Sequence, residues 1–145
     1  MKPQFLFELF DEATSLNNRL RIVAEHIHGQ GEGSAGRRSI LRSLDFSGPQ
    51  TVPQMARVRL VSRQHIQILV NALIDDGLLE LAKNPSHKRS SIVQLSKRGK
   101  QMVMTMNKTE EEWLEKLGLD VSKKDIQRTT ETLRAVREAV EKGLQ

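Results

Sequence analysis

The stretch from residue 51 to residue 99 constrains the fold of this 145-residue chain more than any other part of it. It opens with a short apolar helix pattern, breaks at residues 59–61, and resumes with a longer helix pattern. Thr51 and Ser62 stand where their hydroxyls can accept hydrogen bonds from the free amides of a first helical turn. Pro53 is tolerated in such a turn because the amides there have no intrahelical partner. The pattern predicts two short helices joined by a tight turn.

A hairpin is predicted directly after the second helix. Gly77 stands where a helix can end in a left-handed residue, and the strand-like runs 78–83 and 91–96 enclose the turn residues 84–86. From residue 84 to residue 100 every charged side chain is basic, namely Lys88, Arg89, Lys97, Arg98 and Lys100. Such a cationic hairpin can reach a minor groove or its phosphates, although a solvated hairpin edge is the alternative. The predicted fold is mainly α with a small β wing, a winged helix-turn-helix.

The second helix of this unit has two distinct faces. Its apolar residues recur at helical spacing and mark a buried face: Ile66, Leu69, Val70, Leu73 and Ile74. The opposite face carries Arg63, Gln64, Gln67, Ile68 and Asn71. This composition suits base edges in a major groove, where Arg prefers guanine and Gln or Asn prefers adenine. The alternatives are that the amides are ordinary solvated residues and that Ile68, instead of contacting a thymine methyl group, lies at the edge of the core.

Residues 51–99 resemble the DNA-binding core of the MarR (multiple antibiotic resistance regulator) family of bacterial transcription factors. The motifs that carry the resemblance keep the family's order and spacing: Thr51-Val52, Val61-Ser62, Asp75-Asp76-Gly77-Leu78-Leu79-Glu80, Asn84-Pro85-Ser86-His87-Lys88-Arg89 and Leu95-Ser96-Lys97-Arg98-Gly99. Three positions depart from the family pattern, which leaves the operator sequence open. Ile68 stands where a basic residue is common, His87 replaces an acidic residue, and Lys88 replaces the first of an arginine pair.

The resemblance implies which residues contact DNA. In the recognition helix they are Ser62, Arg63, Gln64, His65, Gln67, Ile68 and Asn71, and in the wing they are His87, Lys88 and Arg89.

Three amphipathic helices are expected to flank this unit. Apolar residues recur every three or four positions over 3–28 and from 100 to about 117, and a near-heptad seam follows Ser122. We expect a single MarR-like domain over 1–145, with the winged helix-turn-helix in 34–99 and dimerisation helices in 3–28 and 100–144. The helices could instead fold back within one monomer, but a homodimer is favoured by the resemblance and because paired readers match a pseudo-palindromic operator.

Composition narrows the class of protein further. The net charge of +5 and the pI of about 9.8 favour polyanionic partners, and the absence of cysteine excludes thiol redox sensing and Cys-ligated zinc. No apolar run is long enough for a membrane span and no signal peptide is visible, so a cytoplasmic location without membrane attachment is expected. The glycines of 29–36 follow a predicted helix, whereas a nucleotide-binding glycine motif needs a strand before it. His26 and His28 are two residues apart, so on a helix they point in different directions, which argues against their binding one metal ion. No metal, cofactor or enzymatic activity is therefore expected.

The sequence thus predicts a homodimeric, sequence-specific double-stranded DNA-binding transcription regulator that acts as a repressor. Because many family members sense small phenolic or anionic molecules, a small aromatic or anionic ligand remains open. His26, Met102, Met106 and Trp113 could line a crevice for it, although Met and Trp at helical spacing are more typical of a core. The alternative function is a winged-helix dimer that acts as a protein-interaction module without specific DNA binding, against which the cationic wing argues.

Overall fold

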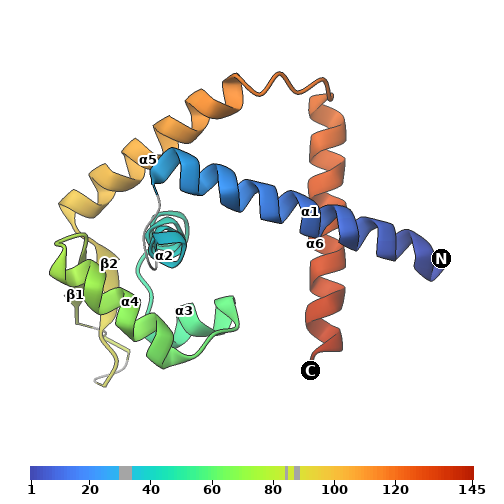
Figure 1. Cartoon of the computed structure of the whole chain (residues 1–145). Helices are drawn as coiled ribbons and strands as arrows, with labels where there is room; N and C mark the ends of the chain where they lie inside the picture. The colour runs from blue at the N-terminus through green and yellow to red at the C-terminus, as the bar shows by residue number, and fades with distance from the viewer. Residues whose placement is uncertain (30–33, 84, 87–88) are drawn as a thin grey trace. The chain divides into compact units, whose positions relative to one another are not determined.

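The computed structural model describes residues 1–29, 34–83, 85–86 and 89–145. Within these ranges the elements follow one another as α1 (Pro3–His28), α2 (Ser34–Ser47), α3 (Val52–Arg59), α4 (Arg63–Asp75), β1 (Leu79–Ala82), β2 (Ile92–Leu95), α5 (Lys97–Glu115) and α6 (Lys123–Gly143) (Figure 1). The chain forms two compact units, residues 1–111 and residues 112–145. The mainly α fold with a small β wing is confirmed.

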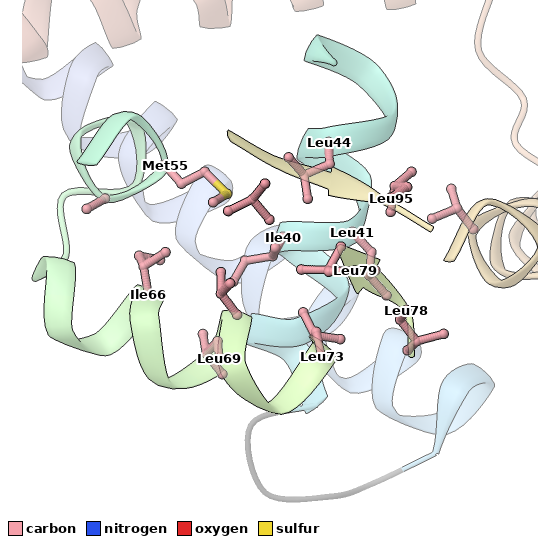
Figure 2. Packing of buried hydrophobic residues seen from close by; sticks show 14 of the residues in the cluster. Ile40, Leu41, Leu44, Met55, Ile66, Leu69, Leu73, Leu78, Leu79 and Leu95 are labelled. Carbon is pink, nitrogen blue, oxygen red and sulfur yellow. The ribbon is translucent and has the colours of Figure 1, made fainter. Parts of the chain in front are cut away.

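One hydrophobic core holds the winged helix-turn-helix together (Figure 2). Ile40 of α2, Met55 of α3 and Val70 of α4 are fully buried. The other core residues come from the same helices, from the base of the hairpin and from the start of α5: Leu41, Leu44, Ala56, Ile66, Leu69, Leu73, Leu78, Leu79, Val93, Leu95, Val103 and Met106. Burying a large aliphatic side chain stabilises a fold by about 1.5–3 kcal/mol, so this cluster fixes the position of α4.

The wing is a two-stranded antiparallel sheet with Leu79 opposite Leu95 and Ala82 opposite Ile92. Gln50 adds a third, single-residue bridge, because its N–H donates to the Val93 carbonyl at 3.1 Å and its carbonyl accepts from the Val93 N–H at 2.8 Å. The hairpin is therefore tied to the segment that precedes α3. Both strands are shorter than the runs predicted from the sequence, because only these residues keep the paired register.

The boundaries of the long helices agree closely with the sequence. The α1 helix spans the predicted residues 3–28, and α6 begins after Ser122, whose Oγ accepts from the Asp125 N–H at 3.1 Å. The α5 helix ends two residues earlier than expected. The Leu117 N–H bonds the Leu114 carbonyl three residues back, and Gly118 then takes a φ of +62°, so the helical pattern stops there.

Neither α1 nor α6 has a buried residue within the single chain. Large apolar side chains of α1 are 40–66% exposed, among them Phe5, Phe7, Phe10 and Ile22. The apolar seam of α6 is also exposed, with Ile126 at 44% and Val140 at 49%.

Among the described helices, none combines the length and the apolar character that crossing a bilayer requires.

Candidate nucleic-acid interface

Local side-chain interactions begin both helices of the helix-turn-helix. The Thr51 Oγ1 accepts from the Gln54 N–H at 3.3 Å while the Gln54 side chain accepts from the Thr51 N–H at 2.8 Å, a reciprocal capping box. The Ser62 Oγ accepts from the His65 N–H at 3.1 Å and so begins α4. Both caps agree with the sequence prediction.

The turn between the two helices is sharp because Leu60 adopts a left-handed conformation, with φ of 54° and ψ of 40°. Residues other than glycine rarely adopt this conformation, and here the surrounding hydrogen bonds support it. The Leu60 and Val61 N–H groups donate to carbonyls at the end of α3, which closes that helix and redirects the chain into α4.

The α4 helix presents to solvent every recognition-helix residue that the sequence predicted. Ser62, Arg63, Gln64, His65, Gln67, Ile68 and Asn71 are exposed, while Ile66, Leu69, Val70 and Leu73 are buried. Ile68 is 61% exposed, so the alternative that it lies at the edge of the core is wrong. The Gln67 Nε2 donates to the Asn71 Oδ1 at 2.8 Å, one turn along the same face.

Part of the predicted wing contact set can be placed. Arg89, which lies in the hairpin between β1 and β2, is exposed, whereas His87 and Lys88 lie outside the described residues, as does Asn84. The base of the hairpin is firmly held: the Ser96 Oγ donates to the Gly77 carbonyl at 2.6 Å and accepts from the Gly99 N–H at 3.0 Å. The wing is thereby fixed to the end of α4 and to the start of α5.

A groove of about 410 Å³ lies between α4 and the wing. Arg63, Gln64 and Gln67 line it from α4, and Arg89 with Ser90 and Ser91 lines it from the hairpin. The structure therefore brings together two guanidinium groups and two amides that are up to 26 residues apart in the sequence (from Arg63 to Arg89). Guanidinium groups bind phosphates and amides can bind base edges, so the groove has the chemistry of a nucleic-acid surface.

A second groove, of about 520 Å³, lies between α3 and the wing. It is lined by Arg57 of α3 and again by Arg63, together with Thr51, Gln54 and Ser90. Sequence reasoning did not single out Arg57. The sequence could have indicated Arg57, because the buried side of α3 is formed by Met55 and Ala56 and Arg57 lies on the opposite, polar side.

The arginines of α2 and of the end of α3 have structural partners within the protein. Arg37 forms an ion pair with Asp76 at the end of α4, and Arg42 forms one with Glu110 of α5. The Arg59 guanidinium donates to the Ser39 carbonyl at 2.9 Å and to the Met55 carbonyl at 3.1 Å, and its burial lowers the pKa of this group. Arg37 and Arg42 are therefore held by carboxylates of the same chain.

Glu110 connects three helices of the first unit. Its Oε1 bonds the His28 Nε2 at 2.6 Å at the end of α1 and also pairs with Arg42 of α2. Burial acts to raise the pKa of Glu110, but the hydrogen bonds and charges of Arg42 and His28 outweigh it, so the pKa is lowered. The carboxylate thus links α5 to α1 and to α2. In the described ranges no cluster of three or more potential metal-binding side chains is found.

Comparison with known proteins agrees with this geometry. The MarR family model matches residues 37–90, a range that includes α3, α4 and β1 and ends before β2. An uncharacterized protein of Mycobacterium tuberculosis is 32% identical over 99 residues, which are 68% of this chain and 66% of that protein. The matched segment therefore spans just under two thirds of the relative's length.

Solved structures share the fold over almost the whole chain. A MarR family protein from Bacillus stearothermophilus superposes with a TM-score of 0.78 at 15% identity, covering 97% of this chain and 99% of that one. The transcriptional regulator BldR from Sulfolobus solfataricus superposes with a TM-score of 0.76 at 18% identity, covering 96% and 99%. The chain therefore shares the fold of MarR family proteins, and its residues 37–90 match the model of that family.

Proposed function

We propose that the protein is a homodimeric, sequence-specific double-stranded DNA-binding transcription regulator that acts as a repressor. The observation that carries the proposal is the groove between α4 and the wing, where Arg63 and Arg89 stand beside Gln64 and Gln67. Phosphate contacts position a protein on a duplex and base contacts give specificity, and this groove offers side chains for both.

In the proposed complex α4 lies in a major groove and the wing follows the backbone toward the adjacent minor groove. The exposed residues Ser62, His65, Ile68 and Asn71 extend the contact surface of α4 beyond the groove-lining side chains. His87 and Lys88 join Arg89 in this proposal on the basis of the sequence alone.

The exposed apolar faces of the terminal helices support the homodimer. Phe5, Phe10 and Leu16 on α1 are at least 40% exposed, and so are Ile126 and Val140 on α6. Apolar surface left in water forgoes roughly 25 cal/mol per Å² that burial would supply. A second copy of the chain would cover these faces and set two α4 helices about 34 Å, or roughly 10 base pairs, apart.

Repression follows if the dimer occupies promoter DNA that polymerase needs. A small aromatic or anionic ligand would relieve it by favouring a dimer with a different spacing of its α4 helices. The four residues that the sequence suggested for a ligand crevice do not all face open space. Met106 is 5% exposed and belongs to the core, whereas Met102 is 40% exposed.

The test is a fluorescence titration of labelled duplexes at several salt concentrations, with the oligomeric mass measured in parallel. If each protomer makes about four phosphate contacts, the dimer should show a log-log salt slope of roughly −7. Arg89→Ala should weaken binding to all sequences alike and make the slope shallower by roughly 2 per dimer, because one phosphate contact is lost in each protomer.

Arg137→Ala is the matched control, since it removes the same charge from α6, where the Arg137 Nη1 donates to the Glu141 Oε1 at 2.9 Å. Its DNA affinity should equal that of the original protein. An Arg89→Ala variant with unchanged affinity would contradict the wing assignment. A monomer that binds no duplex in dilute buffer would refute the proposal, and a dimer that binds none would favour the protein-interaction module.

A further inference from the structure

The outer face of α4 carries a pair of amides that hydrogen-bond each other. Gln67 Nε2 donates to Asn71 Oδ1 at 2.8 Å, and both side chains are exposed. A glutamine amide has two N–H donors and one carbonyl acceptor, so Gln67 keeps a donor and its Oε1 for another partner. Because the bond restricts the rotamers of both residues, Gln67 would lose less side-chain entropy when it binds a base.

Ile68 lies on the same face, one helical turn after Gln64 and three residues before Asn71. Its side chain is 61% exposed, and its β-branched side chain is restricted at χ1. The outward face of α4 therefore offers a stiff apolar group next to an oriented amide. This combination matches one base pair type in particular.

In the major groove an A·T pair presents adenine N7 as an acceptor and N6 as a donor, and it presents the C5-methyl group of thymine. An amide can accept from N6 and donate to N7, and an aliphatic side chain can cover the methyl group. At a G·C pair the guanine offers only the acceptors N7 and O6, so the glutamine Oε1 would face another oxygen without a proton between them.

We propose that α4 reads A·T pairs through Gln67 and Ile68, with Asn71 as the positioning residue for Gln67. Gln67 contacts the N6 and N7 edge of an adenine, and Ile68 contacts the methyl group of a thymine in the same or the adjacent pair. This inference rests on the proposed function and adds the bases that each half-site must contain.

The experiment uses as its probe the duplex that the original protein recovers from a random-sequence pool. Each thymine of this duplex is replaced in turn by deoxyuridine, which removes only the methyl group. Replacement at one position in each half-site should lower the affinity about fourfold, which is the change expected when the burial of one methyl-sized group is lost. Ile68→Ala should bind the thymine and uridine duplexes equally.

Adenines are then replaced in turn by 7-deazaadenine, which removes the N7 acceptor. Replacement at one position in each half-site should lower the affinity, by about 5- to 150-fold if the whole bidentate contact is lost. With the Gln67→Ala variant, the same replacement should not lower the affinity. Asn71→Ala should reduce the preference for adenine over guanine at that position. Asn71→Asp keeps the oxygen that accepts from Gln67 and should restore this ratio, even if its charge weakens binding to every sequence.

Phe46→Ala is the control for loss of an exposed apolar side chain, because Phe46 is 94% exposed at the end of α2 and not on α4. It should keep both the uridine and the deazaadenine penalties. If the selected duplex is bound but no uridine position matters, or if Ile68→Ala retains the penalty, this inference is wrong while the proposed function stands. If the pool yields no bound duplex, the proposed function fails and the inference fails with it.

Discussion

Replacing Gly99 by alanine tests how the wing is joined to α5. A Cβ at this position would overlap the Leu78 carbonyl oxygen and lie 3.0 Å from the Leu78 carbonyl carbon and 3.3 Å from the Leu95 Cδ2. The same Leu78 carbonyl accepts a hydrogen bond from the Ser96 N–H at 3.1 Å. Since the overlapping atom belongs to the backbone, no side-chain rotation relieves the clash, and the start of α5 must move away from the hairpin.

The magnitude follows from three effects. Forcing an extra carbon into a packed site costs about 1–3 kcal/mol, and weakening the Ser96–Leu78 hydrogen bond costs about 0.5–1.5 kcal/mol. Alanine recovers up to ~1 kcal/mol relative to glycine within a helix. Together these effects should lower the free energy of unfolding by about 0.5–4.5 kcal/mol, which is a substantial part of the ~5–15 kcal/mol of a typical domain but leaves the protein folded.

Urea unfolding at a fixed protein concentration, followed by far-UV circular dichroism, measures this change. With a slope of about 1–3 kcal/mol per M, the midpoint should fall by roughly 1 M. Gly143→Ala is the matched control, because Gly143 is also helical and a Cβ there meets nothing within 4 Å. It should be as stable as the original protein or slightly more stable. If Gly99→Ala unfolds at the original midpoint, the reasoning from this close approach is refuted.

Two further changes test the start of α4 and the carboxylate that joins three helices. Ser62→Ala removes the hydrogen-bond acceptor for the His65 N–H and should lower the free energy of unfolding by about 0.5–2 kcal/mol. Ser62→Asp can still cap α4 and should retain most of the original stability. Equal urea midpoints for all three proteins would contradict the capping role. Because folding lowers the pKa of Glu110, its ionised form stabilises the folded state above the ordinary value of 4.5, and this contribution is lost as the pH falls through the folded-state pKa. The difference in urea midpoint between the original protein and Glu110→Gln should therefore shrink on going from about pH 7 to about pH 3.5, and a difference that does not change with pH would argue against the shift.

The features that could be predicted from the sequence depend on interactions between residues that are only a few positions apart in the chain. The caps at Thr51, Ser62 and Ser122 each join a side chain to an amide three residues further on, so residue type and spacing suffice to find them. The left-handed Gly77, with φ of +74°, was visible for the same reason. The faces of α4 followed from its 3.6-residue period, which is why its candidate contact residues were all found to be exposed.

The sequence could not place side chains whose partners are distant in the chain. Arg57, Arg37 and Arg42 have the same chemistry and lie on similar helical patterns, yet Arg57 lines a groove beside the wing while the other two form ion pairs. Which arginine is available to a ligand depends on where Asp76 and Glu110 lie after folding. That placement is a property of helix packing and not of local sequence.

By itself, then, the chain's order of residues determined where α3, α4 and α6 begin, the presence of the hairpin and the amphipathic character of α4, because backbone geometry and capping act over one or two turns. Only the tertiary structure decided that Arg63 and Arg89 share a groove, and that Glu110 links α5 to α1 and α2. These outcomes depend on the shared hydrophobic core, which sets the separation of elements that the sequence leaves unspecified.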